Sequence, residues 1–274
     1  MGKFDGILIC TDLDGTLMKN DKTVSRENLE ALEYFKSEGG RFTFITGRMP
    51  YFSRQIFDTV RPNAPVGCIN GGGIYDYGKG EYLMLNLLPV NVREVVSDIA
   101  DAVDGIGVIL NCKDKLYFPY DNDGTALHRR LTGMPYLGAD IKSFDIPIAK
   151  VVFADMREEA ILRVAQLLDK HPRAKEFDFI RSEKLLYEIL PKGNSKGNLL
   201  RELSHILGID MRRTVALGDY NNDVSMIEAA GVGIAVSNAV DEAKAVADRI
   251  TVSNEEHALA RTIEEIEQGV ITFS

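Results

Sequence analysis

Two aspartates separated by one residue follow an apolar run near the start of the chain. Residues 6–10 predict a buried strand, and Asp12 and Asp14 come just after it. Side chains two positions apart on a strand point to the same side, so both carboxyl groups are expected beyond its carboxyl end, where α/β sheets bind ligands. Taken alone, the pair is explained equally well as a solvated strand end followed by an Asp14-Gly15 turn.

Further polar residues take equivalent places at later strand ends and helix starts. They are Thr46-Gly47-Arg48 after residues 41–45, Gly218-Asp219 after residues 214–217, and Lys196 and Asn222-Asp223 at the start of expected helices. Because α/β sites are built at the edge where strands end and helices begin, we expect all of these side chains near Asp12 and Asp14.

The clustered carboxylates suit a metal-assisted transfer of a phosphoryl group. A phosphate monoester dianion repels a carboxylate nucleophile, so the site needs a cation that neutralises both. Several aspartates without His or Cys favour Mg²⁺ over zinc. Asp12 and Asp219 would contribute to the metal site, and Asp223 would either bind Mg²⁺ directly or orient Lys196.

The two aspartates of the first motif have distinct expected roles in this chemistry. Asp12 would attack phosphorus and form an aspartyl-phosphate, because a carboxylate is ionised at neutral pH without an activating base. Asp14 would protonate the leaving alkoxide and then deprotonate the attacking water. The equatorial oxygens would be held by the Thr46 hydroxyl, the Lys196 ammonium and backbone N–H groups near Leu13 and Gly47.

The segments DLDGTL, TGR, NSKG and GDYNND resemble the four motifs of the haloacid dehalogenase superfamily, and the large insert after the third strand resembles the type IIB cap of the Cof-type phosphatases. The resemblance covers essentially the whole chain. It implies Asp12 as nucleophile and Mg²⁺ ligand, Asp14 as an acid/base that also ligates Mg²⁺ through its backbone carbonyl, and Asp219 as the third ligand. It also implies phosphate contacts from Leu13, Thr46, Gly47, Lys196 and Asn222. Members that only dehalogenate lack the second aspartate, so dehalogenation is disfavoured.

The elements that must position these residues predict an α/β fold, with a Rossmann-like parallel-sheet core and an inserted α+β cap. Apolar runs alternate with segments of helical period at both ends of the chain, and the pattern changes between them. We expect residues 1–82 and 191–274 to form one core and residues 83–190 to form the cap. The first core helix is expected to begin after Ser25, with a buried face of Leu29, Leu32 and Phe35.

Composition excludes several other classes of protein. The 274 residues include 41 acidic and 32 basic side chains, and the net charge of −9 argues against nucleic acid or anionic membrane as a partner. We find no signal peptide and no run of about 18 apolar residues, so the chain is expected to be cytoplasmic. The three cysteines have no CxxC spacing and are expected to be reduced core thiols. A monomer or weak homodimer is expected.

The chain is therefore expected to be a Mg²⁺-dependent phosphomonoester hydrolase acting on small phosphate esters. Sugar phosphates are the expected substrates, because many caps of this type close over polyol phosphates and residues 121–124 form a polar loop. Pyridoxal phosphate and flavin mononucleotide stay open. A phosphomutase is the alternative within enzymes, and a non-catalytic regulatory binding module is the alternative outside them; crowded carboxylates argue against the latter.

The roles of several other side chains stay open on sequence alone. Arg48 lies beside the site in sequence, yet an Arg at a strand end is as often a surface residue. The run 128–130 and Arg181 in the cap could present cations to an anionic substrate, although a solvated face explains them as well. The family resemblance suggests that Asn70 lies near the substrate.

Overall fold

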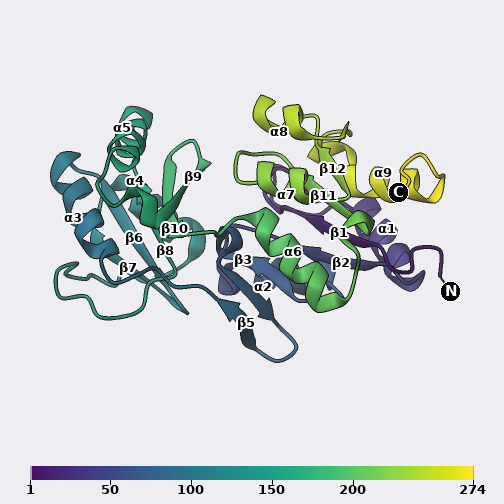
Figure 1. Cartoon of the computed structure of the whole chain (residues 1–274), viewed down its shortest axis with the longest axis horizontal. Helices are drawn as coiled ribbons and strands as arrows, with labels where there is room; N and C mark the ends of the chain where they lie inside the picture. Colours follow the sequence, from purple (N-terminus) through teal and green to yellow (C-terminus); the bar gives the residue numbers. More distant parts are fainter. Residues whose placement is uncertain (1, 274) are drawn as a thin grey trace. The chain divides into compact units, whose positions relative to one another are not determined.

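The chain forms two compact units in the computed structural model, which describes residues 2–273 (Figure 1). One unit is Met1–Met84 together with Ser195–Ser274, and the other is the intervening Leu85–Asn194. The two ends of the chain thus build one unit, into which the second is inserted.

A five-stranded sheet, all of whose pairings are parallel, forms the centre of the first unit. Its strand order is β13 (Arg249–Ile250), β12 (Val232–Ala235), β11 (Thr214–Gly218), β1 (Leu8–Thr11) and β2 (Arg41–Phe44). Thr11 pairs with both Leu217 and Phe44, so these three strands end level with one another. The prediction that the first and last segments form one sheet is confirmed.

Helices cover both faces of this sheet, which explains why β1, β11 and β12 are buried along their whole length. Ile9 and Leu217 share one hydrophobic cluster with side chains of α1 (Arg26–Ser37) and α9 (Ala258–Glu267). Alternate strand residues, such as Leu8 and Cys10, belong to a second cluster with side chains of α6 (Lys196–Leu207) and α7 (Val224–Ala229). Burial on both faces fixes the strand register, because a slip of one residue would exchange the two clusters.

Polar caps set the starts of two core helices. The Ser25 hydroxyl accepts a hydrogen bond from the Asn28 amide at 3.2 Å, as predicted for α1. Of the predicted inner face, Leu32 and Phe35 are buried and Leu29 is partly buried. Ser195 caps α6 in the same way, at 3.1 Å from the Asn198 amide. Because Ser195 occupies the cap position, Lys196 is the first residue of α6.

Three elements of the first unit were not predicted from the sequence. They are α2 (Pro50–Val60), β4 (Gly73–Asp76) and β5 (Glu81–Leu85), and β4 and β5 form a three-stranded sheet with β3 (Val66–Cys68). Helix α2 begins at Pro50 after Met49, whose side chain makes no capping hydrogen bond, so the usual polar start signal is missing. The remaining helical segments of this unit are η1 (Ile69–Gly71), η3 (Met211–Arg213), α8 (Asp241–Val246) and η4 (Asn254–Glu256).

The inserted unit is an α+β fold built on a five-stranded sheet whose neighbouring strands are antiparallel. The strand order is β7 (Lys115–Tyr120), β6 (Gly107–Cys112), β8 (Lys150–Ala154), β10 (Leu186–Pro191) and β9 (Phe177–Glu183). Its helical segments are α3 (Val92–Ala102), α4 (Asp123–Thr132), α5 (Glu158–Asp169) and η2 (Ala174–Glu176). Helices α3 and α5 pack on the strands through Val96, Ile99, Ile161 and Val164.

The polar run 121–124 leads into helix α4, which begins at Asp123, so only the first two residues of the run precede the helix. Asn122 is the cap residue and exchanges hydrogen bonds with Thr125, while Arg129 forms an ion pair with Asp121. Arg181 is likewise paired with Glu158 at 2.6 Å. These side chains are therefore used within the inserted unit, which weakens the expectation that they recognise an anionic or polyol substrate.

Two further expectations from the sequence can be compared with the described residues. Cys10, Cys68 and Cys112 are buried, and none of them is in a disulfide. Among the helices of residues 2–273, none combines the length and the apolar character needed to cross a lipid bilayer.

His128 makes the inserted unit sensitive to acid. It lies on α4 near Lys150 of β8 and Glu188 of β10, an ion pair with an N–O distance of 2.9 Å. Burial, aided by the Lys150 charge, lowers the pKa of His128 from 6.5 to about 4. The unfolded state therefore binds more protons between these values, so the stability due to neutral His128 is lost as the pH falls from 6.5 to 4.

Because His128 is half-buried, we expect wild type to lose about 2 kcal/mol more stability than His128→Gln over this interval. Urea unfolding at the two pH values measures the difference. His205→Gln, at an exposed position of α6, is the matched control and should follow wild type. Equal acid sensitivity in wild type and His128→Gln would contradict the prediction.

Candidate active site

Three carboxylates meet at the carboxyl edge of the parallel sheet. Asp12 follows β1, Asp219 follows β11, and Asp223 precedes α7. Each offers an oxygen that lies within 4.8 Å of the others. The structure thus brings together the residues that the sequence placed at separate strand ends and helix starts.

Lys196 joins two of these carboxylates from the start of α6. Its Nζ lies 2.6 Å from Asp12 Oδ1 and 2.6 Å from Asp223 Oδ1, and its side chain is fully buried. Burial by itself lowers the pKa of Lys196, but the two carboxylates outweigh burial and raise that pKa above its usual value. Lys196 is therefore a permanently charged ammonium in this site.

Asp223 is held on both of its oxygens by the protein. Oδ1 accepts from Lys196, and Oδ2 accepts from the backbone amides of Asp219 and Tyr220 at 3.0 and 3.1 Å. These bonds fix the turn that carries Asp219 and also the direction of the Lys196 ammonium.

The carboxylate cluster has more negative charge than its surroundings balance. Burial raises the pKa of Asp12 well above its usual value; Lys196 opposes this, and the neighbouring carboxylates add to it. Burial and Asp223 together raise the pKa of Asp219 to about 7, although the Thr16 hydroxyl donates to Asp219 Oδ1 at 2.8 Å. Hard oxygen donors that need additional positive charge fit a divalent cation such as Mg²⁺.

Gly15 keeps the first motif close to Asp219. A Cβ atom at this position would lie 2.4 Å from Asp219 Oδ2, and the backbone has φ of +78°, which disfavours any residue with a side chain. The turn after Asp14 can approach the Asp219 carboxylate this closely because glycine stands there.

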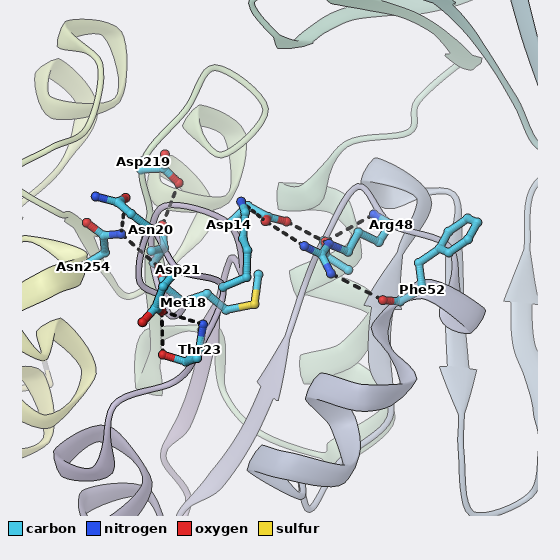
Figure 2. A network of polar contacts seen from close by, with 12 residues as sticks. Asp14, Met18, Asn20, Asp21, Thr23, Arg48, Phe52, Asp219 and Asn254 are labelled. Carbon is cyan, nitrogen blue, oxygen red and sulfur yellow. Dashed lines mark hydrogen bonds and ion pairs between the residues drawn. The ribbon is translucent and has the colours of Figure 1, made fainter. Parts of the chain in front are cut away.

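Asp14 is engaged by two cations instead of by the carboxylate cluster. Arg48 donates from Nε to Asp14 Oδ2 at 2.8 Å and from Nη2 to Oδ1 at 2.7 Å (Figure 2). Lys22 donates to Asp14 Oδ1 at 2.8 Å. Burial raises the pKa of Asp14, but Arg48 and Lys22 outweigh it and hold the pKa below its usual value. Arg48, left open by the sequence, therefore belongs to the site.

The expected phosphate-binding residues lie around the same edge. Thr46 is buried, and its hydroxyl accepts from the Arg48 amide at 3.2 Å. Asn222 donates from Nδ2 to Asn70 Oδ1 at 3.0 Å. A Cβ atom on Gly47 would lie 2.8 Å from that same Asn70 oxygen. The Leu13 side chain is fully buried in the core, so only its main chain is available for the expected contact.

A left-handed turn ties three of these loops together. Ile69, Asn70 and Gly71 have φ of 57°, 51° and 101°, and a positive φ at a buried, β-branched Ile is strained. The Asn70 amide donates to the Thr46 carbonyl at 3.1 Å, and a Cβ atom on Gly71 would lie 2.4 Å from the Ser195 carbonyl oxygen. The turn thus sets the spacing between Thr46 and the start of α6.

Two contributors were missed by the sequence reasoning. Thr16 stands two residues after Asp14 in the first motif, and that position is a signal that could have found it. Lys22 carries no such signal, because its contact with Asp14 depends on a loop whose backbone is left-handed at Lys22, with φ of 65°.

Comparisons with known proteins agree with this arrangement. A model of the haloacid dehalogenase-like hydrolase family matches residues 9–263. The chain is 31% identical over 276 residues to the putative phosphatase YxeH of Bacillus subtilis, with 94% of this chain and 97% of that protein covered. It is 29% identical to the 5-amino-6-(5-phospho-D-ribitylamino)uracil phosphatase YitU of the same bacterium, with 94% and 96% covered. A crystal structure of a haloacid dehalogenase-like hydrolase from Bacteroides thetaiotaomicron aligns with a TM-score of 0.82 at 27% identity, covering 95% of this chain and 99% of that one.

The chain therefore belongs to the haloacid dehalogenase-like hydrolase family. It is a phosphatase, a phosphoric monoester hydrolase, and it acts on small phosphorylated molecules. The family resemblance and the fold class expected from the sequence are both confirmed.

Proposed function

We propose that the chain hydrolyses phosphate monoesters in two half-reactions, with Asp12 as nucleophile and Mg²⁺ as cofactor. The observation that carries the proposal is the Lys196 ammonium 2.6 Å from Asp12 Oδ1, inside a cluster of carboxylates that requires more positive charge. The ammonium orients Asp12 and is positioned to attract a phosphate oxygen at the same place.

Asp14 moves the protons in both half-reactions. In the first, an Asp12 oxygen bonds to phosphorus, the bond between phosphorus and the ester oxygen breaks, and Asp14 gives that oxygen the proton it took from water in the preceding turnover. In the second, Asp14 takes a proton from water, the water oxygen bonds to phosphorus, and the bond to Asp12 breaks. Inorganic phosphate leaves, and Asp12 is a free carboxylate again.

Asp12 and Asp219 are the side chains that would hold Mg²⁺, and the family resemblance adds the Asp14 backbone carbonyl. The cation would offset the charge of the phosphate dianion and so let the anionic Asp12 approach it. We assign Asp223 to orienting Lys196 and the Asp219 turn, because protein donors engage both of its oxygens. The sequence had left this role and direct ligation open.

The phosphate oxygens would be held by groups that lie at the same edge of the sheet as Asp12. They are the Thr46 hydroxyl, the Lys196 ammonium, the Asn222 amide and the main chain near Leu13 and Gly47. They come from the loops after β1, β2 and β11 and from the start of α6, so the phosphate would be held from several sides.

We propose sugar or polyol phosphates as the substrates, with Leu85–Asn194 acting as the cap that selects them. The support is the name of one relative, a phosphatase whose substrate carries its phosphate on a ribityl chain. The polar run 121–124 gives no support, because its side chains cap and pair within α4.

The proposal is tested by phosphate release from sugar and polyol phosphates, pyridoxal phosphate and flavin mononucleotide, in EDTA and after Mg²⁺ is added back. We expect release only with Mg²⁺ and the highest kcat/KM with a polyol or sugar ester. Asp219→Asn should raise the half-saturating Mg²⁺ concentration at least about tenfold, whereas Asp58→Asn, on the exposed side of α2, should not.

Each part of the proposal has its own contrary outcome. Activity that survives EDTA in metal-free buffer would contradict the metal requirement. Turnover confined to pyridoxal phosphate or flavin mononucleotide would contradict the substrate class. Transfer between sugar positions that needs a bisphosphorylated activator, with no phosphate released, would establish a mutase instead.

A further inference from the structure

We propose that Arg48 is a positioning residue that sets the plane of the Asp14 carboxyl group for proton transfer. This inference rests on the acid/base role proposed for Asp14. Its basis is a two-point contact, in which Nε and Nη2 of one planar guanidinium reach different oxygens of Asp14, at 2.8 and 2.7 Å. Two parallel bonds between planar groups fix orientation as well as distance, which a single ammonium contact cannot do.

Arg48 is itself fixed by the loop that follows β2. Its remaining Nη1 donates to the Phe52 carbonyl oxygen at 3.4 Å, as Figure 2 shows. Its backbone amide donates to the Thr46 hydroxyl at 3.2 Å, and its carbonyl accepts from the Ile69 amide at 3.1 Å. The guanidinium therefore transmits the geometry of the Thr46 loop and of the first turn of α2 to Asp14.

Lys22 contributes to the same carboxylate in a different way. Its Nζ makes one contact, to Oδ1 at 2.8 Å, and 65% of its side chain is exposed, against 30% for Arg48. A flexible, solvated ammonium supplies charge but does not define a plane. We therefore assign the positioning to Arg48 and not to Lys22.

The contact is compatible with a proton that arrives at Asp14 and leaves it again. A guanidinium only donates hydrogen bonds, and a protonated carboxyl oxygen can still accept one, so a proton on one Asp14 oxygen weakens its bond to Arg48 without requiring that bond to break. The other oxygen keeps its bond and prevents the carboxyl group from turning away. The two-point contact with Arg48 thus holds the Asp14 carboxyl group in place through both half-reactions.

Two esters with different leaving groups distinguish a role in positioning the acid from a general loss of activity. A sugar alkoxide leaves only as it receives the proton of Asp14, whereas p-nitrophenolate leaves as a stable anion and needs no proton. We expect Arg48→Met to lower kcat/KM about 10- to 100-fold for a sugar phosphate and less than about threefold for p-nitrophenyl phosphate, because kcat/KM reports the first half-reaction, in which only the sugar ester needs the acid. Inhibition by inorganic phosphate should stay unchanged.

Two further variants separate orientation from charge. Arg48→Lys keeps the charge but cannot make the two-point contact with Asp14. It should therefore lose activity with the sugar phosphate selectively, as Arg48→Met does. In an Asp14→Asn background, Arg48→Met should have no additional effect, because there is no acid left to position. Arg54→Met is the matched control: it removes another Arg–Asp pair, with Asp58 on α2, and should behave as wild type.

Several outcomes would overturn the inference without touching the proposed function. They are full activity of Arg48→Lys, an equal loss of kcat/KM with both esters, and weaker inhibition by inorganic phosphate, which would show that Arg48 binds the phosphate directly. If Asp14→Asn itself lowers kcat/KM equally for both esters, the acid role of Asp14 fails and the proposed function is at fault. A selective loss in Asp14→Asn that Arg48→Met does not share leaves the proposed function intact and refutes only the positioning role.

Discussion

Replacing Lys196 with methionine is expected to lower the free energy of unfolding by about 3–5 kcal/mol and to abolish measurable phosphate release. The Lys196 side chain is fully buried, and its Nζ lies 2.6 Å from both Asp12 and Asp223. Methionine fills a similar volume, but it leaves two buried carboxylates side by side without a counter-charge. The cost arises from these stranded charges more than from the lost hydrogen bonds.

The size of this loss should depend on pH in a defined direction. The pKa of Lys196 is raised in the folded protein, so its contribution to stability is present below the unfolded pKa and is lost only as the pH rises through the folded value. In Lys196→Met the stranded carboxylates can take up a proton in acid. The difference in stability from wild type should therefore be largest at neutral and mildly alkaline pH and should shrink as the pH falls.

Urea unfolding in EDTA measures the effect. Lys192→Met, which removes an exposed lysine paired with Asp178, should cost less than about 1 kcal/mol. Adding Asp223→Asn to Lys196→Met should restore part of the stability, because one of the stranded charges is gone, yet it should not restore activity. If Lys196→Met were as stable as Lys192→Met, the buried ion pairs would not hold this site together.

Local signals in the sequence were sufficient for the part of the site that lies on regular elements. Asp12 and Asp219 follow continuously apolar strands, and Lys196 follows the capping residue Ser195, so each position is determined by its immediate neighbours. Parallel strands that end level with one another then bring these residues to one edge. The fold and most of the carboxylate cluster follow from such rules.

The contacts that depend on loop geometry could not be predicted in the same way. Arg48 and Asp14 are 34 residues apart, and nothing local decides whether an Arg at a strand end turns inward or into solvent. Lys22 reaches Asp14 only through a left-handed backbone conformation that a lysine rarely adopts. The run 121–124 was interpreted from the sequence as a substrate-binding loop, but in the structure its side chains cap helix α4. The same polar residue types are common in binding loops and at helix caps, so the sequence alone does not distinguish the two.

Replacing Asp12 with asparagine is expected to reduce kcat at least about a thousandfold while leaving the fold at least as stable in EDTA. Asparagine has nearly the same shape, and its oxygen can still accept from Lys196, but it does not attack phosphorus. Burial and the nearby carboxylates raise the pKa of Asp12, so above the unfolded pKa its charge opposes folding, and asparagine removes that charge. Acid quenching with a substrate labelled in its phosphoryl group should trap an alkali-labile label on wild type and none on Asp12→Asn.

The expected changes in the free energy of unfolding distinguish a variant that loses activity because it lacks the nucleophile from one that also loses folded structure. Lys196→Met and Asp12→Asn are both expected to be inactive, but only the first should unfold at lower urea concentration. Asp58→Asn, an exposed aspartate on α2, should keep both the label and the activity. A labelled Asp12→Asn protein would place the nucleophile elsewhere. A destabilised one would mean that the charge of Asp12 supports the fold, contrary to the crowding of carboxylates around it.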